Sequence, residues 1–333
     1  MSIIHSVPRT YGDELNSAGI KKTNMEKDEI PGFLPPIEII RFSSYRPGPK
    51  FLVLGAVHGN EICGPIAIRK IIEEIRSGLI KLQRGTVSFI PIVNQKAYRQ
   101  NTREGDRNLN RNLQEAAIAR DNEDRIANIL CPVLKDHDVL LDIHSFKSEG
   151  IPFVFAGPDN NEGTLEPFSL ADEELALAGS LGVDLVMRGW LESYASGYPS
   201  HPFHGVGTTE YMRYAGGYAV TLECGNHSAP SAPDIAYKAI RNALAHLSMI
   251  NADKPESVLR RHVQMKQVFL AEQDGDRLNG SWQTFDPVKK DSVIAIRATG
   301  EELKAPFDGL IIFPNIQAKK GESLFYLAEE TER

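Results

Sequence analysis

The strongest constraint on the fold is an alternation of short, continuous apolar segments with amphipathic helical patterns. Phe51–Val57 is apolar throughout and lies between Gly48 and Gly59, and the isoleucines from Ile66 to Ile75 then recur at helical spacing. Strands without polar alternation are those buried on both faces. The pattern therefore predicts an α/β fold, a mixed sheet with helices on both faces.

Further elements are expected along the same part of the chain. The expected strands are Thr86–Val93, Asp138–Ile143, Ile151–Ala156, Asp184–Arg188 and Tyr218–Leu222, and the expected helices are Gln114–Leu134 and Asp234–Ile250. After about Pro255 only short strands separated by Gly, Asp and Lys turns are expected, at Val263–Leu270, Ser292–Ile296, Gly309–Phe313 and Ser323–Leu327. We therefore expect an irregular lead-in over residues 1–36, an α/β domain over 37–254 and a small all-β domain over 255–333.

Composition and charge exclude several classes of protein. The 333 residues are 41% hydrophobic and 24% charged, as in ordinary folded proteins. A net charge of −7 without a long Lys/Arg run argues against nucleic acid or a membrane surface as the main partner. No apolar run is long enough to span a bilayer, and the segment up to Asn24 lacks the apolar core of a signal peptide. Three widely spaced cysteines favour a reducing compartment, so we expect a cytoplasmic protein. The sequence leaves open whether the protein forms a homo-oligomer.

Two strand ends carry residues that suit a metal ion. His58 and Glu61 follow the strand Phe51–Val57 on a glycine-containing turn, and His144 follows Asp138–Ile143. Two imidazoles and a carboxylate are a common ligand set of hydrolytic zinc sites. Asp142, two residues before His144, is expected to orient that imidazole.

Other metal-binding residue types are given lesser roles. Cys63 is expected to pack at the start of the following helix. His201 and His204 have ligand-like spacing in a Gly/Pro-rich loop, and we expect them to line a pocket at most.

The segment Asn101–Asn112 is dense in arginine and asparagine. Arg103, Arg107 and Arg111 are four residues apart, which is compatible with a solvated helix face, but the glycine and asparagines between them favour a structured loop. Guanidinium groups bind carboxylates in a bidentate manner. Beside a metal ion, such a loop would hold an anionic substrate.

Glu223 ends the apolar strand Tyr218–Leu222 and precedes Cys224 and Gly225. From this position alone, an incidental surface carboxylate and a general base at a zinc site are equally compatible with the sequence.

Together these segments resemble the succinylglutamate desuccinylase/aspartoacylase family of the zinc carboxypeptidase superfamily. The resemblance covers most of residues 50–250, in the order of the family's motifs: Gly55–Glu61, Thr102-Arg103 with Asn108–Arg111, Asp142–Ser145 and Thr221–Gly225. It implies one zinc ion per chain, held by His58, Glu61 and His144, with Glu223 as the general base. It also implies that Arg103, Asn110 and Arg111 contact substrate, and that Arg213, ten residues before Glu223, does so as well.

The C-terminal region is similar to the small β-domain of such deacylases and to a biotinyl/lipoyl-type hammerhead barrel. The similarity rests on Ala305–Gly309 and Lys319–Glu322. The Met-Lys-Met attachment tripeptide is absent from Pro314–Lys319, so covalent biotin or lipoate is not expected.

The sequence thus predicts a zinc amidohydrolase that removes an acyl group from a small, anionic N-acyl amino acid or related amine. In this hypothesis Glu223 takes a proton from water and delivers it to the leaving amine, and Arg103 stabilises the oxyanion or binds a carboxylate. Two alternatives remain: a carboxypeptidase on the same scaffold, and a non-catalytic ligand- or partner-binding protein that kept the fold. No phosphate-binding loop, nucleophile elbow or H-E-x-x-H helix suggests other chemistry.

Overall fold

The computed structural model describes residues 36–332, so the expected lead-in lies outside the described residues except for Pro36. The helices are α1 (Cys63–Arg76), α2 (Gln95–Gln100), α3 (Asn122–Lys135), α4 (Ala171–Ser180), α5 (Trp190–Gly197), α6 (Thr208–Tyr214) and α7 (Ala232–His246). The strands before α7 are β1 (Ile40–Ser43), β2 (Lys50–Gly55), β3 (Thr86–Ile90), β4 (Val139–Phe146), β5 (Phe153–Phe155), β6 (Leu185–Arg188) and β7 (Tyr218–Asn226). Those after α7 are β8 (Arg261–Leu270), β9 (Arg277–Leu278), β10 (Pro287–Val288), β11 (Val293–Ile296), β12 (Glu302–Lys304), β13 (Gly309–Ile312) and β14 (Ser323–Thr331).

An 11-stranded mixed sheet is the framework of the molecule, in the order β1-β3-β2-β4-β7-β5-β6-β8-β14-β13-β10. Its centre, β3-β2-β4-β7, is parallel, while β5 pairs antiparallel with β7. The carboxyl ends of β2, β4 and β7 therefore lie at one edge, where ligands commonly bind in α/β folds.

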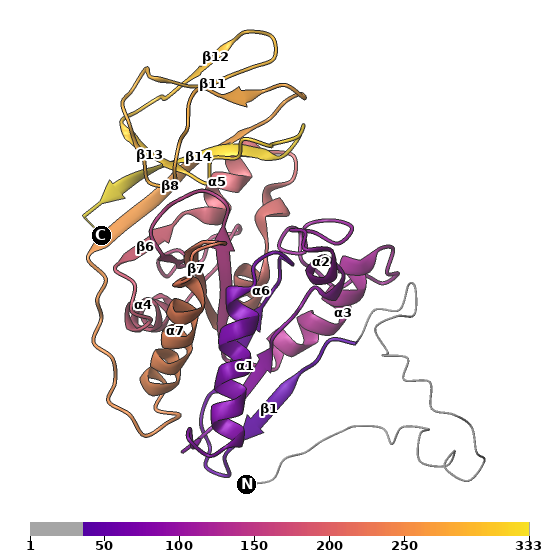
Figure 1. Ribbon diagram of the computed structural model, residues 1–333, viewed down its shortest axis with the longest axis vertical. Helices are drawn as coiled ribbons and strands as arrows, with labels where there is room; N and C mark the ends of the chain where they lie inside the picture. The colour runs from indigo at the N-terminus through magenta and orange to yellow at the C-terminus, as the bar shows by residue number, and fades with distance from the viewer. Residues whose placement is uncertain (1–35, 333) are drawn as a thin grey trace, which may run out of the picture.

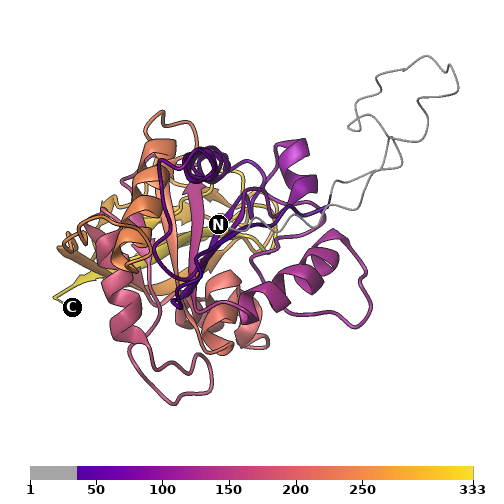
Figure 2. The ribbon, with the colours of Figure 1, turned by 90° about the horizontal axis from the view of Figure 1, so that it is seen from below.

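Helices cover both faces of this sheet because the central strands are apolar on both faces. In β2, Phe51 and Val53 pack into a core with α1, α4 and α7, whereas Leu52 and Leu54 pack into a second core with α3 and α6. Seen from below, α1 and α3 lie on opposite sides of the strands (Figure 2). The predicted mixed α/β fold is confirmed.

The predicted helix Gln114–Leu134 is wrong at its start. The structure begins α3 at Asn122, because Asp121 caps it by accepting a hydrogen bond from the Asp124 backbone N–H at 2.7 Å. Residues 101–121 contain no helix, so the segment Asn101–Asn112 is a loop.

Among residues 255–332 the regular elements are all strands, and Figure 1 shows them at the end of the molecule away from α1. They are joined to the main sheet, since β8 pairs with β6 and β14 pairs with β8; β9, β11 and β12 form a separate three-stranded sheet. The expected boundary falls in residues 251–260, which contain no helix or strand. No helix in the described part of the chain is long and apolar enough to cross a membrane.

Candidate metal centre

Two of the three predicted metal ligands come from the turn after β2. The strand ends at Gly55, and Ala56 has a φ of +47°, which turns the chain so that His58 and Glu61 are buried below the edge of the sheet. Gly59 is needed in this turn, since a Cβ there would lie 2.0 Å from the backbone of Ala97.

The third ligand and the predicted base lie on neighbouring strands. His144 on β4 is opposite Glu223 on β7 in the register of the parallel pair. Glu223 therefore lies within β7, because the strand continues to Asn226. Both side chains are buried at the carboxyl edge, beside the turn after β2.

The ligand atoms of His58, Glu61 and His144 all lie within 4.8 Å of one another. Nδ1 of His58 is 2.9 Å from Glu61 Oε1, Nδ1 of His144 is 2.9 Å from Glu61 Oε2, and the two Nδ1 atoms are 3.2 Å apart. Lone pairs of two imidazoles and a carboxylate thus converge on one point. A divalent cation fits this donor set, and the three residues form a group that can hold a metal ion.

A polar group lies beside the far nitrogen of each imidazole. Nε2 of His144 lies 2.9 Å from Oδ2 of Asp142, and Nε2 of His58 lies 3.0 Å from Oδ1 of Asn108. Asp142 also accepts a 2.5 Å hydrogen bond from Thr208 Oγ1. Such outer partners fix the tautomer of a metal-binding histidine, and in both histidines Nδ1 is the nitrogen that faces Glu61.

The electrostatics of the cluster follow from burial and from these pairs. Burial, followed by the Arg103 charge, lowers the pKa of His58 to about 4. Burial opposes the charged form of His144, but Asp142 and Glu61 raise its pKa well above the usual value. Burial likewise opposes ionised Glu61, yet His58 and His144 lower its pKa well below the usual value. The two carboxylates therefore favour a positive charge at His144, which is the sign of charge that a bound cation would bring.

Glu223 is close to this cluster but is not one of its ligands. Burial raises its pKa to about 8, against the opposing effect of His144. Its Oε2 is buried and has no hydrogen-bond partner among the described residues. A carboxylate with a raised pKa and an unpartnered oxygen suits proton transfer.

The loop after α2 brings Arg103 to the cluster, where Nη1 donates to Glu61 Oε1 at 3.0 Å. The buried carboxylate of Glu123, at the start of α3, holds this loop by accepting from the backbone N–H groups of Gly105, Asp106 and Arg107 at 3.1–3.3 Å. Sequence reasoning missed Glu123, because its partners lie 16 to 18 residues away.

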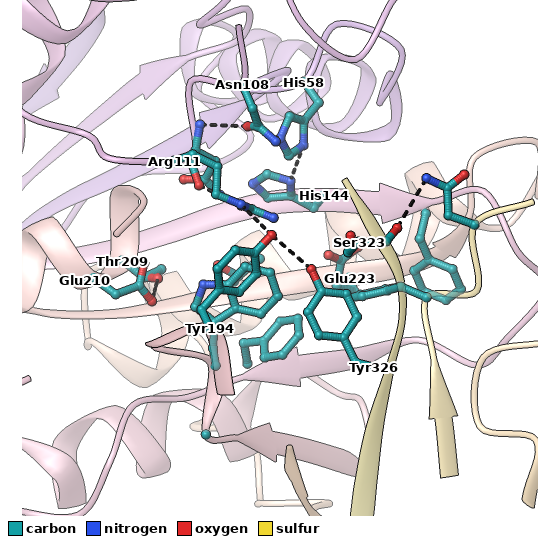
Figure 3. Close-up of a pocket in the computed structure, with 18 of the residues that line it drawn as sticks. His58, Asn108, Arg111, His144, Tyr194, Thr209, Glu210, Glu223, Ser323 and Tyr326 are labelled. Carbon is teal, nitrogen blue, oxygen red and sulfur yellow. Dashed lines mark hydrogen bonds between the residues drawn. The ribbon is translucent and has the colours of Figure 1, made fainter. Parts of the chain in front are cut away.

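A cavity of about 770 Å³ opens over the cluster and is lined by residues of both the α/β part and the C-terminal strands. Arg111 donates from Nε to the Tyr194 hydroxyl at 2.9 Å and lies over the rings of Trp190 and Tyr194. Figure 3 shows that Tyr194 also lies beside Tyr326 of β14; the hydroxyl oxygens of these two tyrosines are 3.1 Å apart. His58, His144 and Glu223 face the same cavity.

The other predicted substrate contacts also line the cavity, with different surroundings. Asn110 Oδ1 accepts from the Thr208 backbone N–H at 2.8 Å. Arg213 is buried, and its guanidinium is bound by Glu174, Glu166 and Glu210 at 2.7–3.4 Å. These contacts favour a structural role for Arg213.

The lesser candidates lie near the site. Cys63 begins α1, where its Sγ is 3.6 Å from the His144 carbonyl oxygen. His204 lines the cavity and is 4.6 Å from the Tyr198 ring, whereas His201 does not line it. Sequence reasoning included Asn108 only as part of the motif Asn108–Arg111, without a role of its own, and did not single out Thr208 or Tyr194, since nothing local marks them.

The fold and site define an α/β protein with a buried His-Glu-His group at the carboxyl edge of its central sheet. A family model described as the succinylglutamate desuccinylase/aspartoacylase catalytic domain matches residues 47–250. The chain therefore belongs to the succinylglutamate desuccinylase/aspartoacylase family, whose members are deacylases and hence hydrolases.

Solved structures share this fold. A succinylglutamate desuccinylase/aspartoacylase from Rhodobacter sphaeroides is 20% identical, with a TM-score of 0.68 over 89% of this chain and 90% of that one. A succinylglutamate desuccinylase from a Silicibacter species is 22% identical, with a TM-score of 0.66 over 89% of each chain. The product-bound ectoine utilization protein EutE (DoeB) from Ruegeria pomeroyi is also 22% identical, with a TM-score of 0.64 over 87% of this chain and 88% of that one. No curated protein sequence matches the chain.

Proposed function

We propose that this protein is a zinc-dependent amidohydrolase that removes an acyl group from a small, anionic N-acyl amino acid or related N-acyl amine. The observation that carries the proposal is the convergence of His58, Glu61 and His144 within 4.8 Å, with Glu223 opposite His144 at the same end of the sheet. Membership of a deacylase family supports the same reaction class.

His58 and His144 would hold the metal through Nδ1, and Glu61 through its carboxylate. When bound, zinc supplies Lewis acidity, which polarises a carbonyl group and lowers the pKa of water. The buried carboxylate of Glu223 takes a proton from the attacking water and returns it to the leaving amine. Its raised pKa keeps the two protonation states close in energy near neutral pH.

The arginines of the loop bind the anionic parts of the substrate. Arg103 is about half-exposed beside Glu61, so its guanidinium can reach the carbonyl oxygen where negative charge develops. Arg111 is held by Tyr194 and by stacking on Trp190, which orients its remaining donors. Together with Asn110, it would fix a carboxylate.

The C-terminal region forms part of the cavity wall, because Phe313 and Asn315, which follow β13, and Tyr326 of β14 line it. We propose that residues 255–333 form a domain that resembles a hammerhead barrel. We also propose that this domain excludes long peptides from the cavity. We also propose that the enzyme is cytoplasmic.

The test is amine release from N-acyl amino acids, N-acyl diamines and C-terminally free dipeptides by the zinc-loaded protein. Hydrolysis of one N-acyl class is the expected result. Hydrolysis of dipeptides alone would replace the proposal with a carboxypeptidase, and stoichiometric zinc without any hydrolysis would favour a binding protein.

A further inference from the structure

Arg188 is a further arginine of the cavity, distinct from the arginines of the loop and from Arg213. It is the last residue of β6, one position beyond the paired residues Phe155 and Met187. The cavity is lined by Phe155, Arg188 and the following Trp190, which stacks on Arg111. Arg188 therefore lines the cavity that also contains Arg111.

The guanidinium of Arg188 has unused hydrogen-bonding capacity. Its Nε is buried and has no hydrogen-bond partner among the described residues. Its Nη1 donates to Asp159 Oδ1 at 2.7 Å, but the side chain of Asp159 is 86% exposed while that of Arg188 is 15% exposed. A pair with one solvated partner is weak, and a buried donor without a partner is unfavourable. A ligand carboxylate could accept a hydrogen bond from Nε and replace Asp159 as the partner of the guanidinium.

Arg213 has the opposite surroundings, although it lines the same cavity. Nε and Nη2 donate to Glu174 at 2.9 and 3.0 Å, Nη1 donates to Glu166 at 2.7 Å, and Nη2 also donates to the Ala219 carbonyl at 2.9 Å. Buried carboxylates therefore occupy the guanidinium. A substrate carboxylate would have to displace them and would meet their negative charge.

We propose that Arg188, rather than Arg213, is the residue that binds a carboxylate of the substrate in this cavity, in addition to the arginines of the loop. The inference rests on the proposed deacylase function for the identity of the ligand. The edge of the guanidinium that carries Nε and one Nη forms two parallel hydrogen bonds with a carboxylate. Arg188 is thus a residue that determines specificity for a substrate with a carboxylate, in the acyl group or in the amine moiety.

Three probe compounds show whether the recognised carboxylate belongs to the acyl group or to the amine moiety. An N-acetyl amino acid carries its carboxylate on the amine moiety, an N-succinyl alkylamine carries it on the acyl group, and an N-acetyl alkylamine carries none. For the zinc-loaded protein, Arg188→Gln is expected to raise KM for one of the two carboxylates by about 10- to 100-fold, with kcat nearly unchanged. KM for the uncharged probe should not move.

Two further variants separate recognition from folding. Arg188→Lys keeps the charge without the fork and should restore only part of the affinity. Asp159→Asn removes the competing counter-ion and should lower KM for the same probe by up to about fivefold. An equal loss for all three probes, or a KM that Asp159→Asn does not lower, would overturn the assignment and leave Arg188 a structural residue.

Binding measured by calorimetry keeps this inference separate from the proposed reaction. If no probe is hydrolysed, the proposed function fails, but carboxylate-dependent binding that Arg188→Gln abolishes would still support the site. Equal binding of the three probes to the wild type and to Arg188→Gln would contradict it.

Discussion

Asp142 shows how a single side chain behind the ligand set can control metal affinity. It is completely buried, lies 2.9 Å from Nε2 of His144 and accepts a hydrogen bond from Thr208. Asp142→Asn should weaken zinc binding by about 10- to 100-fold, because the amide no longer stabilises the imidazole orientation that presents Nδ1. Competition with a chromogenic chelator measures this change. Thr208→Val is the matched control, and a weaker effect is expected from it; unchanged zinc affinity in Asp142→Asn would refute the role.

Arg213 provides a prediction about stability. Its buried guanidinium neutralises Glu174 and Glu166, so Arg213→Gln leaves buried carboxylates without their counter-ion. We expect a loss of about 3–5 kcal/mol in the free energy of unfolding, measured by urea denaturation. Arg41→Gln is the control, since the pair of Arg41 with Asp136 is about half-exposed and contributes little. A loss no larger than that of the control would contradict the structural role.

Two kinds of site residue could be found from the sequence: polar residues near strand ends, and the arginines and asparagines concentrated in the segment Asn101–Asn112. His58 and Glu61 follow β2, and His144 lies near the end of β4. A polar side chain is conspicuous next to a buried apolar run. Arg188 also ends such a strand, but one arginine there has no distinguishing pattern. Its importance depends on what surrounds it, and those neighbours come from distant parts of the chain.

At the scale of elements, the loop after α2 is held chiefly by the start of α3. Glu123 accepts three backbone hydrogen bonds from this loop and further ones from the side chains of Asn94 and Asn122. Glu123→Ala should lower stability by about 2 kcal/mol or more and loosen the loop that carries Arg103. Faster amide hydrogen exchange at residues 105–107 and a lower kcat/KM are the expected results.

Glu115→Gln is the matched control for this variant, because Glu115 pairs with Lys135 at the surface. Unchanged exchange at residues 105–107 in Glu123→Ala would show that the loop is held by other contacts.

Strands were easier to predict than helices for a physical reason. A buried strand needs a continuous apolar run, which is visible within six residues, as in β2. The short helices α2, α5 and α6 span at most eight residues, too few to display a helical period, and were not predicted. The ten-residue helix α4 was not predicted either. The wrong start of α3 has the same origin, because a cap at Asp121 decides it.

At the scale of the molecule, the C-terminal strands carry a pH-sensitive contact. Burial opposes the charged form of Asp276, but hydrogen bonds from the Ala298 backbone N–H and from Arg297 lower its pKa to about 2, against the usual 3.8. Since the folded-state pKa is depressed, its stabilisation is present above about pH 4 and is lost as the pH falls towards 2.

Urea denaturation of the wild type and Asp276→Asn at pH 7, 4, 3 and 2 tests this dependence. The wild type should be more stable at pH 7, and its advantage should shrink below pH 4. An advantage that stays constant down to pH 2 would contradict the assignment.

The pairing of β6 with β8 was not predictable from the sequence. Composition separates residues 255–333 from the rest, but pairing between strands depends on edges that only the folded sheet exposes. As a result, Tyr326 from β14 lies beside Tyr194 in the cavity. The cavity is therefore lined by residues that are far apart in the chain, from His58 after β2 to Tyr326 in β14.

The central claim is that His58, Glu61 and His144 hold one zinc ion and that Glu223 transfers protons beside it. The most direct test is a zinc titration of the metal-free protein in which bound metal and amine release are recorded together, for the wild type and for Glu223→Gln. We predict that binding saturates at one zinc per chain in both proteins, that amine release by the wild type rises in step, and that the variant is slower by about 100-fold or more. Amine release without bound zinc, or near-wild-type turnover by Glu223→Gln, would contradict the account.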